Sequence, residues 1–325
     1  PSVKTVDATN YTKVLTVAAD DTDLDTGAAV ITGGTGTSDV LLVTSSGGTI
    51  TTGIANMTGI EKITTVGTAG TLTMVLADGN IASGETLTID GTSHGAADVL
   101  SVNAAAETNG TVAINVSVAV DSDHVATLGA GNDTFTGTLG TGVQTVTATG
   151  GNNTIITGTG VDIINVGTGQ DTVTVNGGIA NTINFTLSTH LVANSVTVTD
   201  WTAAKGIITF DVADLSAGAT LQNLGQVTDD AIATDTGIDI ITGPVDLADS
   251  ADSDIILIAD ITTAISSSSE LEDALEYGGA LQITANGALA VGDRFLVAYD
   301  DNVSTYIAMV TTNSVIAVDA YIGAG

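Results

Sequence analysis

The chain has 325 residues, of which 37 are acidic and only 5 are basic, so its formal net charge is −32. Such a charge repels nucleic-acid phosphates and anionic lipid headgroups and calls for counter-cations instead. Hydrophobic residues make up 43% of the chain and β-branched residues are abundant, which excludes a disordered chain and favours β-structure. No nucleic-acid partner and no membrane insertion are therefore expected, and no run of residues approaches the ~20 apolar positions of a transmembrane helix. The absence of cysteine means that no disulfide holds the fold.

Residues 1–30 form an acidic segment that we expect at one edge of the fold. One strand is predicted at residues 13–17, and the acidic run 20–27 follows it. Asp21, Asp23 and Asp25 are spaced like the first half of an EF-hand calcium loop, but glycine comes one place late and the twelfth position is not glutamate, which excludes an EF-hand. Two interpretations stay open for the acidic run: a calcium loop of another kind, and a solvated acidic turn.

Residues 31–128 are typical of an irregular β-solenoid, because short β-branched runs alternate with Gly, Asn and Asp turns. One stretch, residues 34–43, is a stretched form of the unit that recurs after residue 129, and it makes Asp39 a candidate metal ligand. The strands are predicted near residues 40–44, 60–66, 71–77, 85–90, 98–103, 111–117 and 124–128.

Residues 129–178 contain a repeat with a period of nine residues. Its first unit is Gly129-Ala130-Gly131-Asn132-Asp133-Thr134-Phe135, and glycine-rich turns follow at 140, 149, 158, 167 and 176. An apolar residue has the same phase in four successive units: Val146, Ile155, Ile164 and Val173. A polar slot lies two residues before each of them: Gln144, Asn153, Asp162 and Asp171. Glycine permits a tight turn with positive φ, and a fixed short period signals a solenoid.

The pattern Gly-x-Gly-x-Asp-x-apolar resembles the nonapeptide of the RTX (repeats-in-toxin) calcium-binding β-roll. The resemblance covers residues 129–178 and implies Ca²⁺ ligands among the slot side chains and the glycine-turn carbonyls. With the acidic residues of the preceding segments, the candidate metal ligands are Gly129, Gly131, Asp133, Asn153, Gly158, Gly160, Asp162, Gly167, Gly169, Asp171, Asp39, Asp21, Asp23 and Asp25.

In the RTX roll, turns alternate between two edges, so that units two apart stack on the same side. This resemblance pairs Asn153 with Asp171, and Asp133 joins them if the longer step from Gly129 to Gly140 keeps the register. The other edge is expected to stack Gln144, Asp162 and Ala180. No pair has two aspartates, so the calcium sites should be weak, with dissociation constants of about 10⁻⁴–10⁻³ M. Asparagine also forms hydrogen-bonded ladders without metal, so a partly metal-free core stays open.

The C-terminal part of the chain is expected to close the solenoid and to form a second domain. Residues 179–212 resemble the segment that follows RTX repeats, and Trp201 is interpreted as a hydrophobic plug on the last coil. Residues 213–325 predict an acidic, β-rich domain that resembles the terminal segment of proteins exported by type I secretion. One helix is predicted at residues 269–276, where a serine cap, early acidic residues and a final Gly-Gly agree. Strands are predicted at residues 281–285, 294–299 and 304–311.

The predicted fold class is all-β: a parallel β-solenoid (β-roll or β-helix) followed by a smaller, mostly β C-terminal domain with one short helix. Residues 91–95 match the G-x-S-x-G motif of a nucleophile elbow, but the residues after them predict turn and strand rather than the required helix. No zinc-protease motif and no phosphate-binding loop motif occurs in the sequence. We therefore expect no enzymatic activity.

The functional hypothesis is an extracellular structural protein of the bacterial cell surface that self-assembles into a calcium-stabilised surface layer or filament. Its expected partner is a second copy of itself, joined through bridging cations, and cell-surface polysaccharide is a further candidate. Two alternatives stay open: a segment of a calcium-dependent RTX adhesin, and the non-catalytic tail of a secreted RTX enzyme. Aromatic residues are only 3% of the chain, which disfavours a ligand pocket and hence the adhesin.

Overall fold

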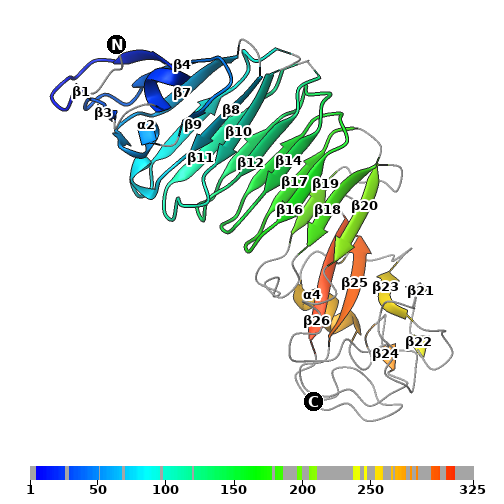
Figure 1. Cartoon of the computed structure of the whole chain (residues 1–325). Helices are drawn as coiled ribbons and strands as arrows, with labels where there is room; N and C mark the ends of the chain where they lie inside the picture. The colour runs from blue at the N-terminus through cyan, green and yellow to red at the C-terminus, as the bar shows by residue number, and fades with distance from the viewer. Residues whose placement is uncertain are drawn as a thin grey trace. The chain divides into compact units, whose positions relative to one another are not determined.

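The chain forms two compact units in the computed structural model (Figure 1). The first comprises Pro1–Phe185 with Asp200–Thr209, and the second comprises Thr186–Thr199 with Phe210–Gly325. The structure describes residues 5–25, 29–50, 52–67, 70–95, 98–118, 121–177, 180–185, 196–199, 205–210, 237–241, 245–246, 253–258, 265, 268–275, 279, 283–284, 294–300 and 305–311.

The first unit is a β-solenoid built from three parallel sheets, which confirms the predicted fold class. Within this unit, sheet I contains β2 (Thr16–Asp20), β4 (Val40–Ser45), β7 (Lys62–Gly67), β9 (Thr86–Asp90), β11 (Thr111–Asn115), β13 (Thr134–Thr136), β15 (Thr154–Thr157) and β17 (Thr172–Val175). Sheet II contains β5 (Thr49–Ile50), β8 (Gly70–Val75), β10 (Asp98–Asn103), β12 (His124–Thr127), β14 (Gln144–Thr147), β16 (Ile163–Val166), β18 (Asn181–Phe185) and β20 (Gly206–Phe210). Sheet III contains β1 (Thr5–Asp7), β3 (Val30–Thr32) and β6 (Met57–Thr58).

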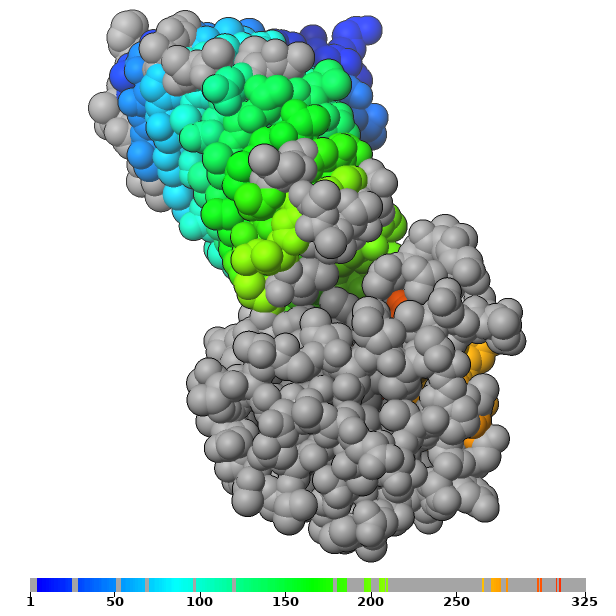
Figure 2. All heavy atoms as spheres, turned by 90° about the vertical axis from the view of Figure 1, so that its right-hand side faces the viewer, coloured from blue at the N-terminus to red at the C-terminus, as the bar shows by residue number. Residues whose placement is uncertain are grey.

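From β9 onward the chain alternates between sheets I and II, so each strand pairs with the strand two places further along the sequence. Figure 1 shows these strands as a regular stack of coils, and on the face drawn in Figure 2 the coloured residues follow one another in chain order. Sheet III occurs only in the first coils. In the repeat region, tight glycine turns connect the two remaining sheets.

Apolar side chains stacked in register fill the interior of the solenoid. Under sheet I the stack is Leu41, Ile63, Ile89, Ile114, Phe135, Ile155 and Val173, all of them buried. Under sheet II it is Ile50, Met74, Val102, Ala126, Val146, Ile164 and Ile183, also buried. The strict alternation of buried and exposed positions places every second residue in this core, and its burial drives folding of the stack.

The N-terminal coil differs from the prediction in two ways. The strand expected at residues 13–17 begins only at Thr16, and the acidic run does not form a turn but a short helix, α1 (Asp21–Asp25). The Asp20 carboxylate accepts hydrogen bonds from the Asp23 backbone N–H and the Thr22 hydroxyl, as a helix cap does. Leu24 is fully buried and α1 contacts α2 (Thr52–Ala55), β2, β4 and β5. Capping and the burial of one leucine therefore favour a helix here.

The solenoid extends beyond the repeat into the segment that was predicted to end it. β18 and β20 both lie in residues 179–212 and continue sheet II. Trp201, the predicted plug, lies outside the described residues.

In its described residues, the second unit contains parallel and antiparallel strand pairs and one short helix. β26 (Thr305–Thr311) pairs antiparallel with both β19 (Thr197–Thr199) and β25 (Arg294–Asp300), and β25 pairs parallel with β23 (Ser253–Ile258). Two further parallel pairs join β23 to β21 (Gly237–Ile241) and β22 (Val245–Asp246) to β24 (Ile283–Thr284). α4 (Ser268–Leu275) buries Leu271 and Leu275, close to the predicted helix bounds. In the described part of the chain, no helix is long and apolar enough to span a membrane.

Candidate functional site

The polar slot residues of the repeat form two columns inside the solenoid. Asp133, Asn153 and Asp171 lie immediately before β13, β15 and β17 at one edge, and Gln144, Asp162 and Asn181 lie at the start of β14, β16 and β18 at the other. All six are buried. The predicted stacking is correct except at its last member, where Asn181 occupies the slot instead of Ala180. Ala180 has a φ of 66° and forms part of the turn, which moves the slot by one residue.

Each column is a hydrogen-bonded ladder that runs along the stack. The backbone N–H of Asp133 donates to Asn153 Oδ1 at 2.9 Å, and that of Asn153 donates to Asp171 Oδ1 at 2.8 Å. In the second column, the N–H of Gln144 donates to Asp162 Oδ1 at 2.9 Å, and that of Asp162 donates to Asn181 Oδ1 at 2.7 Å. Each slot side chain therefore ties its own coil to the backbone of the coil before it.

The same bond recurs outside the nine-residue repeat. The Leu15 N–H donates to Asp39 Oδ1 at 2.7 Å, and the Asp39 N–H donates to Glu61 Oε2 at 2.6 Å. In sheet II the Leu100 N–H donates to His124 Nδ1 at 3.2 Å. Sequence reasoning missed Glu61 and His124. Both lie at the start of a strand with alternating apolar residues, which is the signal that could have identified them.

Amide side chains alternate with carboxylates in both ladders. Asn153 Nδ2 donates to the carbonyls of Gly150 and Gly151 at 2.9 and 3.3 Å, and to Asp171 Oδ1 at 2.9 Å. Gln144 Nε2 donates to the Gly137 carbonyl at 2.9 Å. Asn181 Nδ2 donates to the carbonyls of Gly177 and Lys205 at 3.0 and 2.7 Å. The amide N–H groups thus supply the positive partial charge that the turn carbonyls and carboxylates require.

This arrangement bears on the calcium ligands that the RTX resemblance implies. A Ca²⁺ ion between the turns at Asn153 and Asp171 would need the oxygens that already accept hydrogen bonds from the Asn153 amide. The side chains around Asn153 therefore fit the metal-free ladder, in which the amide nitrogen lies next to these oxygens.

Most of the glycines proposed as ligands lie where the backbones of successive coils approach too closely for a side chain. A Cβ atom at Gly169 or Gly131 would lie 1.9 Å from the carbonyl oxygen of Gly151 or Gly110 in the preceding coil. The same overlap, at 2.1 to 2.4 Å from a carbonyl oxygen, would arise at Gly158, Gly160 and Gly167. Gly129 is less crowded, with 2.8 Å to the Glu107 carbonyl. Among these candidates only Gly169 has a positive φ, of 124°, so backbone contact rather than turn conformation accounts for most of the glycine pattern.

The two carboxyl groups with the strongest burial effect are Asp133 and Asp162. Burial raises the pKa of Asp133, the charge of Glu107 raises it further, and the N–H groups of Val112 and Gly129 oppose the change. Burial also raises the pKa of Asp162. Removal from water disfavours the ionised form, so both groups carry a free-energy cost at neutral pH.

The acidic residues predicted before the repeat have separate surroundings. Asp39 accepts a hydrogen bond from the Gly34 N–H at 2.6 Å in addition to its ladder bond. Asp21 is buried and accepts bonds from the N–H and hydroxyl of Ser46, at 2.8 and 2.9 Å. Asp23 and Asp25 follow on the same helix, so the interpretation as a calcium loop does not match the backbone. Within the residues that the structure describes, no group of three or more His, Asp and Glu side chains could hold a metal.

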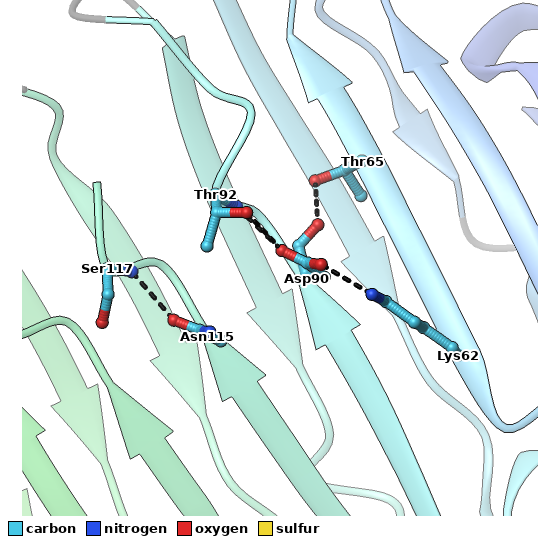
Figure 3. A network of polar contacts seen from close by, with 6 residues as sticks. All are labelled: Lys62, Thr65, Asp90, Thr92, Asn115 and Ser117. Carbon is cyan, nitrogen blue, oxygen red and sulfur yellow. Dashed lines mark hydrogen bonds and ion pairs between the residues drawn. The ribbon is translucent and has the colours of Figure 1, made fainter.

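The outer face of sheet I carries a second polar network (Figure 3). Lys62 Nζ lies 2.7 Å from Asp90 Oδ2, and Asp90 Oδ1 accepts bonds from the N–H and hydroxyl of Thr92. One coil further, the Ser117 N–H donates to Asn115 Oδ1. The Asp90 and Asn115 side chains each accept a hydrogen bond from the backbone N–H two residues later, at the end of a strand. They are therefore structural turn features.

The residues of the G-x-S-x-G match form a turn, as predicted, and β10 rather than a helix follows them. His94 in this turn is buried, and its Nε2 lies 2.8 Å from the Thr65 hydroxyl. The motif therefore lacks the geometry of a nucleophile elbow.

Comparison with models of protein families, with curated proteins and with solved structures finds no match to this chain.

Proposed function

We propose that this chain is a structural protein of the bacterial cell surface that associates with copies of itself through its N-terminal coil, with bridging cations. The observation that carries the proposal is the edge of that coil. β1, β2 and β5 are each the terminal strand of their sheet among the described strands. An edge strand presents backbone N–H and C=O groups that can pair with another chain.

The interior of the same coil is closed, which favours association through the edge rather than through exposed core. Leu24 of α1 and Ile54 of α2 are fully buried against the first coils. The backbone edge therefore remains the feature of this end that can template contact with a second copy.

The charge of the edge explains why cations would be needed. Asp7 and Asp20 are exposed there, and hydrogen bonds from Thr9 and from Thr22 and Asp23 hold the pKa of each carboxyl below its usual range. Both are ionised at neutral pH, and the whole chain carries −32. A second copy with the same acidic excess repels this edge unless divalent cations lie between the two surfaces. Calcium is the expected cation because it prefers carboxylate and carbonyl oxygens.

The RTX resemblance supports an extracellular location and export by type I secretion, and the proposal assigns no enzymatic role. A head-to-tail contact that does not close gives a filament, and added lateral contacts give a sheet. Cell-surface polysaccharide is the second partner that a surface protein of this kind would contact.

The test is sedimentation and electron microscopy of the purified chain in millimolar calcium and in chelator. Ordered fibres or sheets are expected only with calcium. The double variant Asp7→Asn, Asp20→Asn should assemble with a weaker calcium dependence. Asp78→Asn is the matched control, because Asp78 is also exposed and hydrogen-bonded to a threonine but lies away from the edge. A chain that stays monomeric at high concentration in both conditions would favour an adhesin segment or the tail of a secreted enzyme.

A further inference from the structure

Two carboxylates are buried in successive turns at the point where the repeat begins, with no amide between them. Glu107 is 0% exposed in the turn between β10 and β11, and Asp133 is 1% exposed in the next turn of that edge. The two turns are in direct contact, since the Ala130 N–H donates to the Glu107 carbonyl at 2.9 Å. A Cβ atom at Gly129 would lie 3.0 Å from Glu107 Cβ.

One carboxylate oxygen of Glu107 and Asp133 accepts no hydrogen bond from the described residues, whereas the others do. Asp133 Oδ1 accepts from the Val112 N–H at 2.7 Å, and Oδ2 accepts from the Gly129 N–H at 2.8 Å. Glu107 Oε1 accepts from the N–H groups of Asn109 and Gly110, at 3.1 and 2.8 Å. Glu107 Oε2 is buried and has no hydrogen-bond partner in the described part of the chain. A buried, uncompensated carboxylate oxygen is costly, so this position calls for a positively charged or protonated partner.

No lysine side chain whose contacts the structure gives meets that need. Lys62 Nζ pairs with Asp90, and Lys205 Nζ donates to the Val175 carbonyl. In the ladders, an amide lies between successive carboxylates and neutralises the turn. Glu107 and Asp133 lie in successive turns of one edge without a side-chain amide between them, and this difference marks a place in the described solenoid where a cation fits the donor set.

We propose that Glu107, with Asp133 beside it, holds a hard divalent cation of the calcium class at this coil. Carboxylate and carbonyl oxygens are the ligands that such a cation prefers. The Ala104 carbonyl lies 3.2 Å from a Cβ atom at Gly129 and the Gly110 carbonyl 1.9 Å from one at Gly131, so both belong to the turns that meet here. The exposed residues Thr108 and Asn109 adjoin Glu107 and bring solvent to the turn. The inference rests on the cation dependence in the proposed function, but it places the site where the repeat begins rather than between its later turns.

The experiment compares the full chain with Glu107→Gln, by thermal unfolding and by titration calorimetry with calcium chloride, under conditions where the chain is monomeric. Wild type should unfold at a higher temperature in calcium than in chelator. E107Q should lose this difference and bind calcium at least about tenfold more weakly, because affinity follows the charge of the ligands. In chelator E107Q should be at least as stable as wild type, since the amide removes the uncompensated charge.

Two control variants make the result specific to the site. Glu85→Gln removes an exposed charge from the same edge of the preceding coil, and Asp162→Asn removes a buried charge inside the repeat. Both should keep the calcium-dependent shift.

If E107Q keeps the shift, the site is wrong while the cation dependence stands. If D162N abolishes it, calcium lies in the repeat. If calcium does not stabilise wild type and E107Q is more stable at every calcium concentration, the pair shares a proton and the cation site is overturned. Assembly is scored separately by sedimentation, so failure of the proposed function is distinguishable.

Discussion

At the scale of the residue, the chemistry of the solenoid depends on whether a slot holds an amide or a carboxylate. An amide supplies both an acceptor for the previous coil and a donor for the carbonyls of its own turn, whereas a carboxylate supplies acceptors alone. In the order Asp133, Asn153, Asp171, the Asn153 amide separates the two carboxylates and donates to Asp171 Oδ1. Asparagine in this repeat therefore supplies the N–H groups that the turn carbonyls and the neighbouring carboxylate accept.

The variant Asn153→Asp tests this role. It removes the donor to Gly150 and Gly151 and places a second carboxylate against Asp171. In chelator we expect a loss of about 1–3 kcal/mol in the free energy of unfolding, because buried acceptors lose their partner. Added calcium should restore most of that loss, since the variant has the paired aspartates that the RTX motif uses.

The control for this variant is Asn152→Asp, which changes the exposed neighbour. Asn152 Oδ1 accepts from the Gln170 N–H at 2.8 Å, and aspartate keeps that acceptor. A change within about 0.5 kcal/mol is expected. Urea unfolding in chelator and in calcium measures both variants, and an N153D protein as stable as wild type in chelator would contradict the amide ladder.

At the scale of the element, each short strand is stable only through its neighbours in the stack. The strands of the repeat are three or four residues long and bury one or two side chains each, too few for independent stability. Their apolar residues stack in register on the coils before and after. Loss of one such residue opens a gap between two coils, so its effect should exceed that of any outward residue on the same strand.

The pair Ile164→Ala and Ile163→Ala compares the two faces of β16. Ile164 is 0% exposed and stacks between Val146 and Ile183, while Ile163 is 37% exposed on the outer face. I164A should lower the free energy of unfolding by about 2–5 kcal/mol, because it removes buried methyl groups and leaves a cavity. I163A should cost less than about 0.5 kcal/mol. Equal losses in urea unfolding would show that β16 does not face the core as described.

At the scale of the whole molecule, stability depends on pH through buried histidines and buried carboxyl groups, whose pKa values burial shifts in opposite directions. His94 and His124 are buried with their ring centroids 6.2 Å apart, and Asp98 and Asp123 are the charged groups that act on them. Burial, with the nearby His94, lowers the pKa of His124 from 6.5 to about 4. Burial raises the pKa of Asp133 and Asp162 instead. Acidification therefore destabilises the fold through the histidines and relieves the cost of the buried carboxylates.

The pH dependence of unfolding tests this balance. The unfolded chain binds a proton at His124 near pH 6.5 and the folded chain only near pH 4, so stability is present above pH 6.5 and falls as the pH drops to 4. The contribution of His124 is at most about 3 kcal/mol. His124→Asn keeps an acceptor for the Leu100 N–H and should remove much of this slope while leaving the protein folded at pH 7. Thermal midpoints between pH 4 and pH 7 measure the effect, and an unchanged slope would exclude His124 as its source.

The sequence by itself determined the parallel stack, the positions of most of its strands and the C-terminal helix, because these follow from local features. The period of nine, the glycines and the phase of Val146, Ile155, Ile164 and Val173 all depend on residues close in the chain. The RTX resemblance implied the pairing of Asn153 with Asp171 on one edge, and of Asp133 with them if the longer step from Gly129 to Gly140 kept the register. The expectation that failed locally was the acidic run at 20–27, where the capping of α1 by Asp20 and the burial of Leu24 outweighed its loop-like spacing.

Only the tertiary structure decided what the slots contact. The partner of each slot lies about 20 residues away along the chain, in the preceding coil, and its identity depends on the exact register of the turns. A shift of one residue at Ala180 moved the last slot to Asn181, and Glu61, Glu107 and His124 joined the polar interior without any repeat motif. Whether a turn is neutralised by an amide or calls for a cation depends on these contacts between coils, which are set by three-dimensional stacking and not by the local pattern.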